Sequence, residues 1–98
     1  MPIFVTLVKS TAESAKGMVD LDKSYEEGKK ISQQMGIKHI AAYGVLGPYD
    51  LMFIYEAPDE KVAITANVAQ ALKWGGQLET WTVVPIEEFA KLTAKLKG

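Results

Sequence analysis

The stretch Leu46-Gly47-Pro48-Tyr49-Asp50 carries the strongest turn signal of the 98-residue chain. Adjacent Gly and Pro residues followed by an Asp favour a reversal of the backbone. Apolar and aromatic residues dominate both flanks, at 39–46 before the turn and at 51–56 after it. This pattern predicts a β-hairpin with the turn at its tip.

The other elements follow from hydrophobic spacing and capping residues. Residues 2–8 are apolar except for Thr6, which predicts a central strand. Ser/Thr-x-x-Glu and Pro-Asp-Glu signals mark two helix starts, and glycines mark helix ends. The predicted elements are a strand at 2–8, a short helical segment at 10–17, a helix at 20–35, the hairpin strands at 39–46 and 51–56, a helix at 58–74 with Val62, Ala66, Ala69 and Leu72 inward, a strand at 77–84, and a helix at 86–97 with Phe89 and Leu92 inward.

This order, β-α-β-β-α-β with a terminal helix, predicts an α+β fold of the ferredoxin-like type. Its four-stranded antiparallel sheet would carry the helices on one face. The length suits one domain covering residues 1–98.

The hairpin predicts which side chains share a face of the sheet. With a two- or four-residue loop, Leu46 pairs with Leu51. The face toward the helices then holds Ile40, Ala42, Gly44, Leu46, Leu51, Phe53 and Tyr55. The opposite face holds His39, Ala41, Tyr43, Val45, Met52, Ile54 and Glu56, and we expect Phe4, Thr6 and Val8 there too. A three-residue loop with a bulge would exchange the two sets.

The opposite face is too apolar to remain in contact with water. Two such faces packed together would bury it, so we expect a homodimeric α/β barrel or a higher homo-oligomer.

Composition excludes several classes of site. The net charge of −1 and dispersed lysines argue against a nucleic-acid partner, and the absence of arginine disfavours phosphoryl transfer. Without cysteine, thiolate catalysis and zinc-thiolate sites are impossible. A single histidine and scattered carboxylates predict no metal site, and no cofactor is expected. The chain lacks a signal-like start and a long apolar run, so we expect no membrane association and a cytoplasmic location.

Four features together resemble the GYD-domain family, which is named for a Gly-x-Tyr-Asp tip. They are the tip itself, the Glu56-Ala57-Pro58-Asp59 stretch, the opening Met1-Pro2-Ile3-Phe4-Val5, and Thr80-Trp81-Thr82. The resemblance implies a ferredoxin-like fold of the dimeric α/β-barrel group but no settled function. Wider relatives of that group include cofactor-free monooxygenases, isomerases, stress-response proteins and effector-binding domains.

Turn structure alone is enough to explain the residues at the hairpin tip. Gly47 suits a left-handed turn position, Asp50 can cap the backbone of the turn, and Tyr49 can pack its ring and hydrogen-bond through its hydroxyl.

The candidate chemical residues lie elsewhere. His39 is the only histidine, and in the predicted pairing Glu56 lies diagonal to it with Tyr43 along the same face. A carboxylate that orients an imidazole would suit proton abstraction. The candidate cavity residues are Phe4, Thr6, Tyr43, Met52 and Trp81.

Three functions remain open from the sequence. The first is a protein that binds a small apolar or aromatic molecule between the sheets of a dimer. The second is a cofactor-independent monooxygenase or isomerase that uses His39 as its base. The third is a structural or assembly protein without a ligand.

Overall fold

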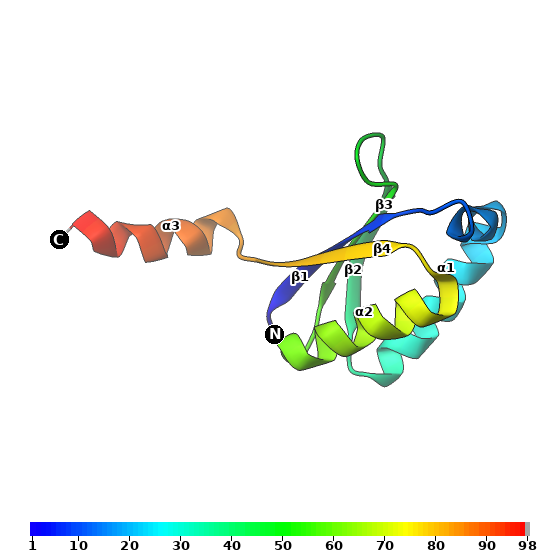
Figure 1. The fold of residues 1–98 in the computed structure, drawn as a ribbon. Helices are drawn as coiled ribbons and strands as arrows, with labels where there is room; N and C mark the ends of the chain where they lie inside the picture. Colours follow the sequence, from blue (N-terminus) through cyan, green and yellow to red (C-terminus); the bar gives the residue numbers. More distant parts are fainter. Residues whose placement is uncertain (98) are drawn as a thin grey trace.

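The structure, a computed structural model, describes residues 1–97 (Figure 1). Its elements are β1 (Ile3–Lys9), the 3-10 helix η1 (Ser14–Asp20), α1 (Leu21–Gln34), β2 (Lys38–Gly44), β3 (Leu51–Glu56), α2 (Glu60–Trp74), β4 (Gln77–Val83), α3 (Ile86–Ala94) and the 3-10 helix η2 (Lys95–Lys97).

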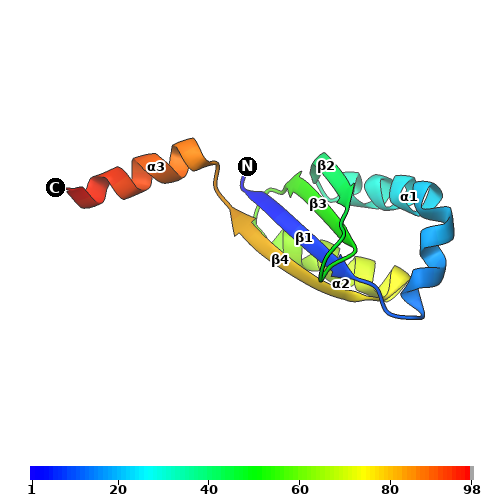
Figure 2. The same cartoon turned by 90° about the horizontal axis from the view of Figure 1, so that it is seen from above.

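The strands form one antiparallel sheet in the order β2-β3-β1-β4. Helices α1 and α2 lie on the same face of this sheet (Figure 1), and the view from above shows the strands in front of α2 (Figure 2). The predicted ferredoxin-like α+β fold is therefore confirmed. The other face, which we call the open face, carries no helix of residues 1–97.

The core lies between the sheet and the helices. It contains Phe4, Ile37, Tyr55, Ala57 and Ala63, which are at most 5% exposed. Small residues on α2 allow this helix to approach the sheet closely.

The prediction that Phe4, Thr6 and Val8 face away from the helices is wrong. Phe4 belongs to the core, and Thr6 and Val8 are also buried. Residues 2–8 are almost uniformly apolar, so β1 offers no alternation from which its two faces can be distinguished.

The predicted hairpin register is also wrong, by two residues. Gly44 pairs with Leu51 and Tyr43 with Met52, which leaves a six-residue loop at 45–50. Leu46 lies in this loop and is fully exposed instead of pairing above the core. Because the shift is an even number, the residues at 41–44 and 51–54 keep their predicted faces.

A β-bulge in β2 changes the position of His39. Ala41 pairs with Ile54, whereas His39 pairs with Tyr55, so Ile40 is an extra residue in the ladder. The predicted inward position of Ile40 is wrong, since its side chain is 51% exposed. His39 turns to the helix side instead of the open face, because an extra residue reverses the alternation beyond it.

The helix boundaries agree with their capping signals. Asp59 accepts a hydrogen bond from Val62 N at 2.9 Å at the start of α2. At the first helix start the predicted capping box of Ser10 and Glu13 is replaced by one that begins one residue later: Thr11 N donates to Ser14 Oγ, and Ser14 N donates to the Thr11 hydroxyl. The 3-10 helix η1 then continues through Gly17, so the prediction that Gly17 ends the segment is wrong.

Three predicted inward positions fail for the same reason. Leu72 on α2 is 83% exposed, and Phe89 and Leu92 on α3 are about half exposed. Helical spacing identifies an apolar stripe but not the surface that covers it. In α3 that stripe faces no part of its own domain within residues 1–97.

Candidate functional site

A cavity of about 140 Å³ lies between the helices and the sheet. Its floor is formed by β1, β2 and β3, and its walls by η1, α1 and α2. Gly17 and Leu21, which are exposed, line one side, so the cavity reaches the surface beside η1. Side chains that matter for its chemistry are Thr6, Ser24, Tyr25, Lys29, Ser32, His39, Phe53, Tyr55, Asn67, Gln70 and Trp74.

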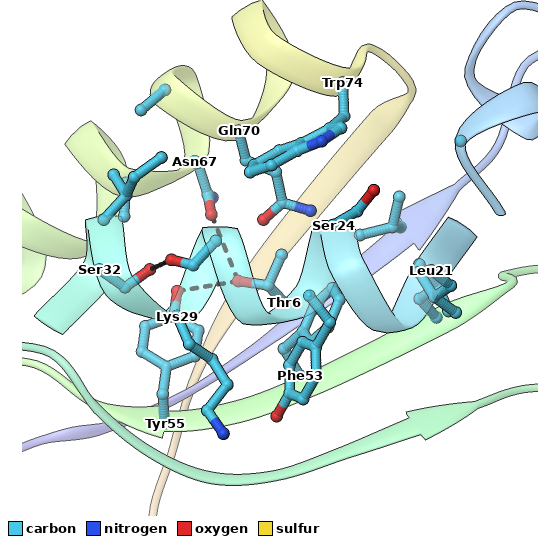
Figure 3. Close-up of a pocket in the computed structure, with 18 of the residues that line it drawn as sticks. Thr6, Leu21, Ser24, Lys29, Ser32, Phe53, Tyr55, Asn67, Gln70 and Trp74 are labelled. Carbon is cyan, nitrogen blue, oxygen red and sulfur yellow. Dashed lines mark hydrogen bonds between the residues drawn. The ribbon is translucent and has the colours of Figure 1, made fainter.

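A hydrogen-bond network around Thr6 forms the polar part of the floor (Figure 3). The Thr6 hydroxyl lies 2.8 Å from the hydroxyls of both Tyr55 and Thr80, and it donates to Asn67 Oδ1 at 3.3 Å. Asn67 Nδ2 in turn donates to the Thr80 hydroxyl. With Thr80 and Tyr55 donating to Thr6, each hydroxyl hydrogen has its own acceptor.

The network therefore satisfies its own buried groups. Thr6 is 2% exposed, so its hydroxyl could not remain there unpaired without a large desolvation cost. Its effect is to fix the Asn67 amide and the Tyr55 ring at the floor.

Aromatic rings line the side of the cavity near β2 and β3. Tyr25 stacks on Phe53 with ring centroids 5.9 Å apart, and it meets His39 edge to face at 6.2 Å. At the other end, a Cβ on Gly28 would lie 3.3 Å from the Trp74 ring, so Trp74 packs directly on the α1 backbone. Planar apolar surfaces thus bound the cavity at both ends.

His39 has no internal partner. Both ring nitrogens are shielded from solvent, and neither makes a hydrogen bond within residues 1–97. Burial lowers the pKa of His39, and the nearby positive charge of Lys29 lowers it further. The imidazole is therefore neutral at neutral pH, with one nitrogen able to donate and the other able to accept.

Lys29 supplies the positive charge of this region. Its Nζ lies 5.1 Å from the centroid of the Tyr25 ring and 3.7 Å from a carboxylate oxygen of Glu26. Because that ion pair is partly exposed, it is weak and leaves the ammonium able to interact with other groups.

The structure separates the predicted site residues into two groups. Thr6 and His39 line the cavity, and Phe4 lies in the core beside it. Glu56, Tyr43, Met52 and Trp81 lie on the open face, where Tyr43 pairs with Met52 and Trp81 pairs with Val5. The predicted arrangement of His39 with Glu56 and Tyr43 on one face is therefore wrong, because the bulge places His39 on the other side of the sheet.

Sequence reasoning missed Tyr25, Lys29, Asn67 and Gln70 as cavity residues, and it favoured a role in the core for Trp74. A signal existed in α2, where Asn67 and Gln70 are three residues apart beside Ala66 and Ala69. Polar amides next to the inward small residues of a helix are a sign of a polar group within a buried face.

The hairpin tip lies outside the cavity. Tyr49 donates to the Glu79 carboxylate, and this bond raises the pKa of Tyr49 and lowers that of Glu79. Asp50 Oδ2 accepts from Ser10 N at 2.7 Å, so it holds the end of β1 rather than its own turn. The prediction of a left-handed Gly47 is wrong, since its φ is not positive.

Within residues 1–97 the chain has neither a membrane-spanning helix nor a metal-binding cluster. No helix in this range is long and apolar enough to cross a membrane. No group of three or more His, Asp or Glu side chains in the same range is placed to hold a metal ion.

Comparison with known proteins gives three similarities. The GYD domain family model matches residues 4–93. A curated relative from Thermus thermophilus, named "Glutamine synthetase and cystathionine beta-lyase binding protein", is 32% identical over 101 residues, covering 99% of this chain and 100% of the relative. Among solved structures, the de novo designed protein Ferredog-Diesel has a TM-score of 0.47 and 14% identity, over 83% of this chain and 84% of that one. A structural similarity of this size carries no information about function.

Proposed function

Since this chain belongs to the GYD domain family, whose name specifies no ligand, we propose its function from the cavity: it is a binding protein for a small molecule that carries one ring. The observation that carries this proposal is His39, whose two shielded nitrogens lack a partner within residues 1–97. A buried polar group without a partner is costly, and a ligand in the cavity can supply the missing hydrogen bond.

The size and walls of the cavity define the ligand. An engineered apolar cavity of about 150 Å³ binds benzene, so about 140 Å³ suits a single six-membered ring. The rings of Tyr25, Phe53 and Trp74 suit a planar apolar body. His39 and the charge of Lys29 favour an oxygen substituent, such as a phenol hydroxyl or a carboxylate.

Binding of phenol, benzoate and toluene to the same protein tests this proposal. Trp74 fluorescence in a Trp81→Phe background, together with calorimetry, would report the affinity. We expect dissociation constants on the order of 0.1 to 1 mM for the oxygen-bearing probes. His39→Leu should weaken phenol and benzoate about tenfold, the value of one hydrogen bond, and leave toluene unchanged.

Glu56→Gln is the matched control, because this residue lies across the sheet from the cavity. It should not change the binding of any probe. Absence of binding of all three probes at millimolar concentration would refute the proposal.

A second candidate is a protein that binds metabolic enzymes, as the name of the Thermus relative describes. The similarity to that relative over the full length of both chains supports this candidate. A second support is α2, which presents Ile64, Val68 and Leu72 outward at four-residue spacing, with exposed fractions of 61%, 54% and 83%. An exposed apolar stripe of this kind suits a partner groove.

Purified glutamine synthetase and cystathionine β-lyase from the organism that encodes this chain would test this candidate. Surface plasmon resonance should detect binding to one of them. Val68→Asp should abolish this binding, whereas Lys73→Gln, at an exposed position about 140° around α2 from Val68, should not. Equal binding by both variants, or none by the unmodified protein, would exclude this use of α2.

An enzyme of the monooxygenase or isomerase type has less support. A neutral His39 could accept a proton, but Glu56 lies on the open face and cannot orient it. The enzyme proposal predicts turnover that His39→Ala abolishes, with a sigmoid pH dependence. Binding without turnover of the ring probes favours the binding protein.

We also propose that the chain forms a homodimer of the α/β-barrel type. The open face carries Ile3, Val5, Met52 and Ile54 in its centre, with Tyr43 and Trp81 54% and 48% exposed. An apolar sheet face of this extent is typical of an interface between copies. Sedimentation equilibrium would measure the mass; a monomer at 100 µM would refute pairing.

A further inference from the structure

The C-terminal arm, residues 84–97, stands apart from the rest of the domain. Every residue of the arm is exposed, and α3 makes its main contacts with η2, which follows it directly. Figures 1 and 2 both show α3 beyond the end of β4, away from α1 and α2. The arm therefore gains no tertiary stabilisation from its own domain.

The arm is nevertheless amphipathic. At 100° per residue, Ile86, Phe89, Leu92 and Leu96 fall on one side, and they are 70%, 51%, 50% and 85% exposed. Lys91 and Lys95 lie on the other side. Isolated helices shorter than about 12 residues are marginal in water, so a nine-residue helix with an apolar stripe requires a surface to cover it.

The geometry at the end of β4 directs the arm outward. Pro85 is extended, with φ −54° and ψ 145°, so the chain continues past the sheet without reversing. The open face of the same domain is thus not within reach of its own arm in this conformation.

We infer that α3 of one copy packs its apolar stripe on the open face of a second copy, and that the second copy returns the contact. Each copy has one convex apolar stripe and one flat apolar face, so a two-fold pair covers both surfaces of both copies. The arm helices, 12 residues from Ile86 to Lys97, span about 18 Å, close to the roughly 23 Å of a seven-residue strand. This inference rests on the proposed homodimer and identifies the segment that joins its copies.

The buried area is adequate for a second copy as the occupant. A helix about 10 Å wide and 18 Å long has a lateral surface of roughly 560 Å², of which a flat partner covers about a third to a half. Each copy buries one side of its own arm and, on its open face, the area that the partner's arm covers; together these amount to roughly 450 Å². This is more than half of the ~800 Å² per partner in a stable interface, and facing parts of the two sheets can supply the remainder.

The absence of cysteine from the chain permits a crosslinking test without background. A copy with Leu92→Cys would be mixed with a copy of different mass that carries Tyr43→Cys, and the mixture oxidised. We expect a disulfide between the two copies, because the arm stripe and the open face would be in contact. Lys91→Cys on the other side of the arm, and Ile64→Cys on the outer face of α2, are the matched controls.

A crosslink that forms equally with Ile64→Cys would overturn the placement on the open face, and so would failure of Leu92→Cys to react with Tyr43→Cys. A second measurement is the mass by sedimentation equilibrium. Phe89→Asp should raise the dimer dissociation constant at least about 100-fold, since the substitution enters the pair twice, whereas Lys91→Asp should change it less than threefold.

The two proposals fail differently. If unmodified protein and Phe89→Asp dimerise equally, the arm contact is wrong and the homodimer stands. If the unmodified protein is a monomer at 100 µM, both are wrong. Because Phe89 lies in the exposed arm, circular dichroism of the variant should lose at most the helical signal of the arm and should keep that of the rest of the domain.

Discussion

Thr6→Val removes one hydroxyl from the centre of the cavity floor without changing the size of the side chain. Valine is at least as favourable as threonine in a central strand, so the backbone preference does not oppose the change. The hydroxyl contacts Tyr55, Thr80 and Asn67, all within 3.3 Å. After its removal Asn67 Nδ2 still donates a hydrogen bond to the Thr80 hydroxyl. The Tyr55 hydroxyl and Asn67 Oδ1, in contrast, each lose the hydrogen bond that they made with Thr6.

The expected loss follows from those two groups. An unsatisfied buried polar group costs about 1–3 kcal/mol, and cavity water can replace part of that loss. We therefore expect Thr6→Val to lower the free energy of unfolding by about 2–3 kcal/mol. For a domain of this length, that corresponds to a decrease in Tm of roughly 10–20 °C.

Urea unfolding followed by circular dichroism, with an unchanged m-value, measures the effect of Thr6→Val. Thr82→Val is the matched control, since Thr82 is an exposed strand residue and should change stability by less than about 0.5 kcal/mol. A double-mutant cycle with Thr80→Val should give a coupling energy above about 0.5 kcal/mol. A loss below about 0.5 kcal/mol for Thr6→Val, or zero coupling, would show that the network does not hold the floor together.

Three further predictions concern stability. Gly76→Ala should lower the free energy of unfolding by about 1–2 kcal/mol, because φ is +90° and the new Cβ would lie 3.3 Å from Lys9 O. Gly47→Ala, at a non-positive φ, is the control and should change it little. Equal urea midpoints for the two variants would contradict this prediction. Folding lowers the pKa of His39 from 6.5, so the unfolded chain binds more protons, and the free energy of unfolding should fall as pH decreases from about 7 through the folded pKa. The difference in this free energy between the unmodified protein and His39→Gln, measured from pH 5 to 8, should isolate the contribution of His39. A difference that does not change with pH would refute the prediction. Asp59→Ala should lower stability by about 1 kcal/mol through loss of the cap on Val62 N, with Asp22→Ala, whose side chain caps no helix, as the control in the same urea titration.

The order of elements was predictable because each boundary has a local chemical cause. The Asp59 cap and the glycines after α1 and α2 act within a few residues of their position, so sequence reasoning could place them. The register of the β2–β3 hairpin was harder to predict from the sequence. The loop at 45–50 uses six residues. Its length depends on hydrogen bonds that Asp50 makes with Val8 in β1 and with Ser10 just after β1.

The composition of the site was the least predictable part. Thr6 is the one buried polar residue of β1, and its partners are 49, 61 and 74 residues away in the chain. The bulge at Ile40 has no Gly or Pro to announce it, yet it decides which side of the sheet receives His39. Both depend on tertiary packing that local propensity does not contain.

The bulge in β2 has a second effect, on the edge of the sheet. β2 is an outer strand, and an outer strand with regular spacing can template the addition of a strand from another molecule. The extra residue at Ile40 interrupts the spacing of free N–H and C=O groups along that edge. The irregularity that turns the imidazole inward therefore also makes this edge a poor start for fibrillar assembly, so a deletion of Ile40 should promote aggregation as well as empty the cavity of its histidine.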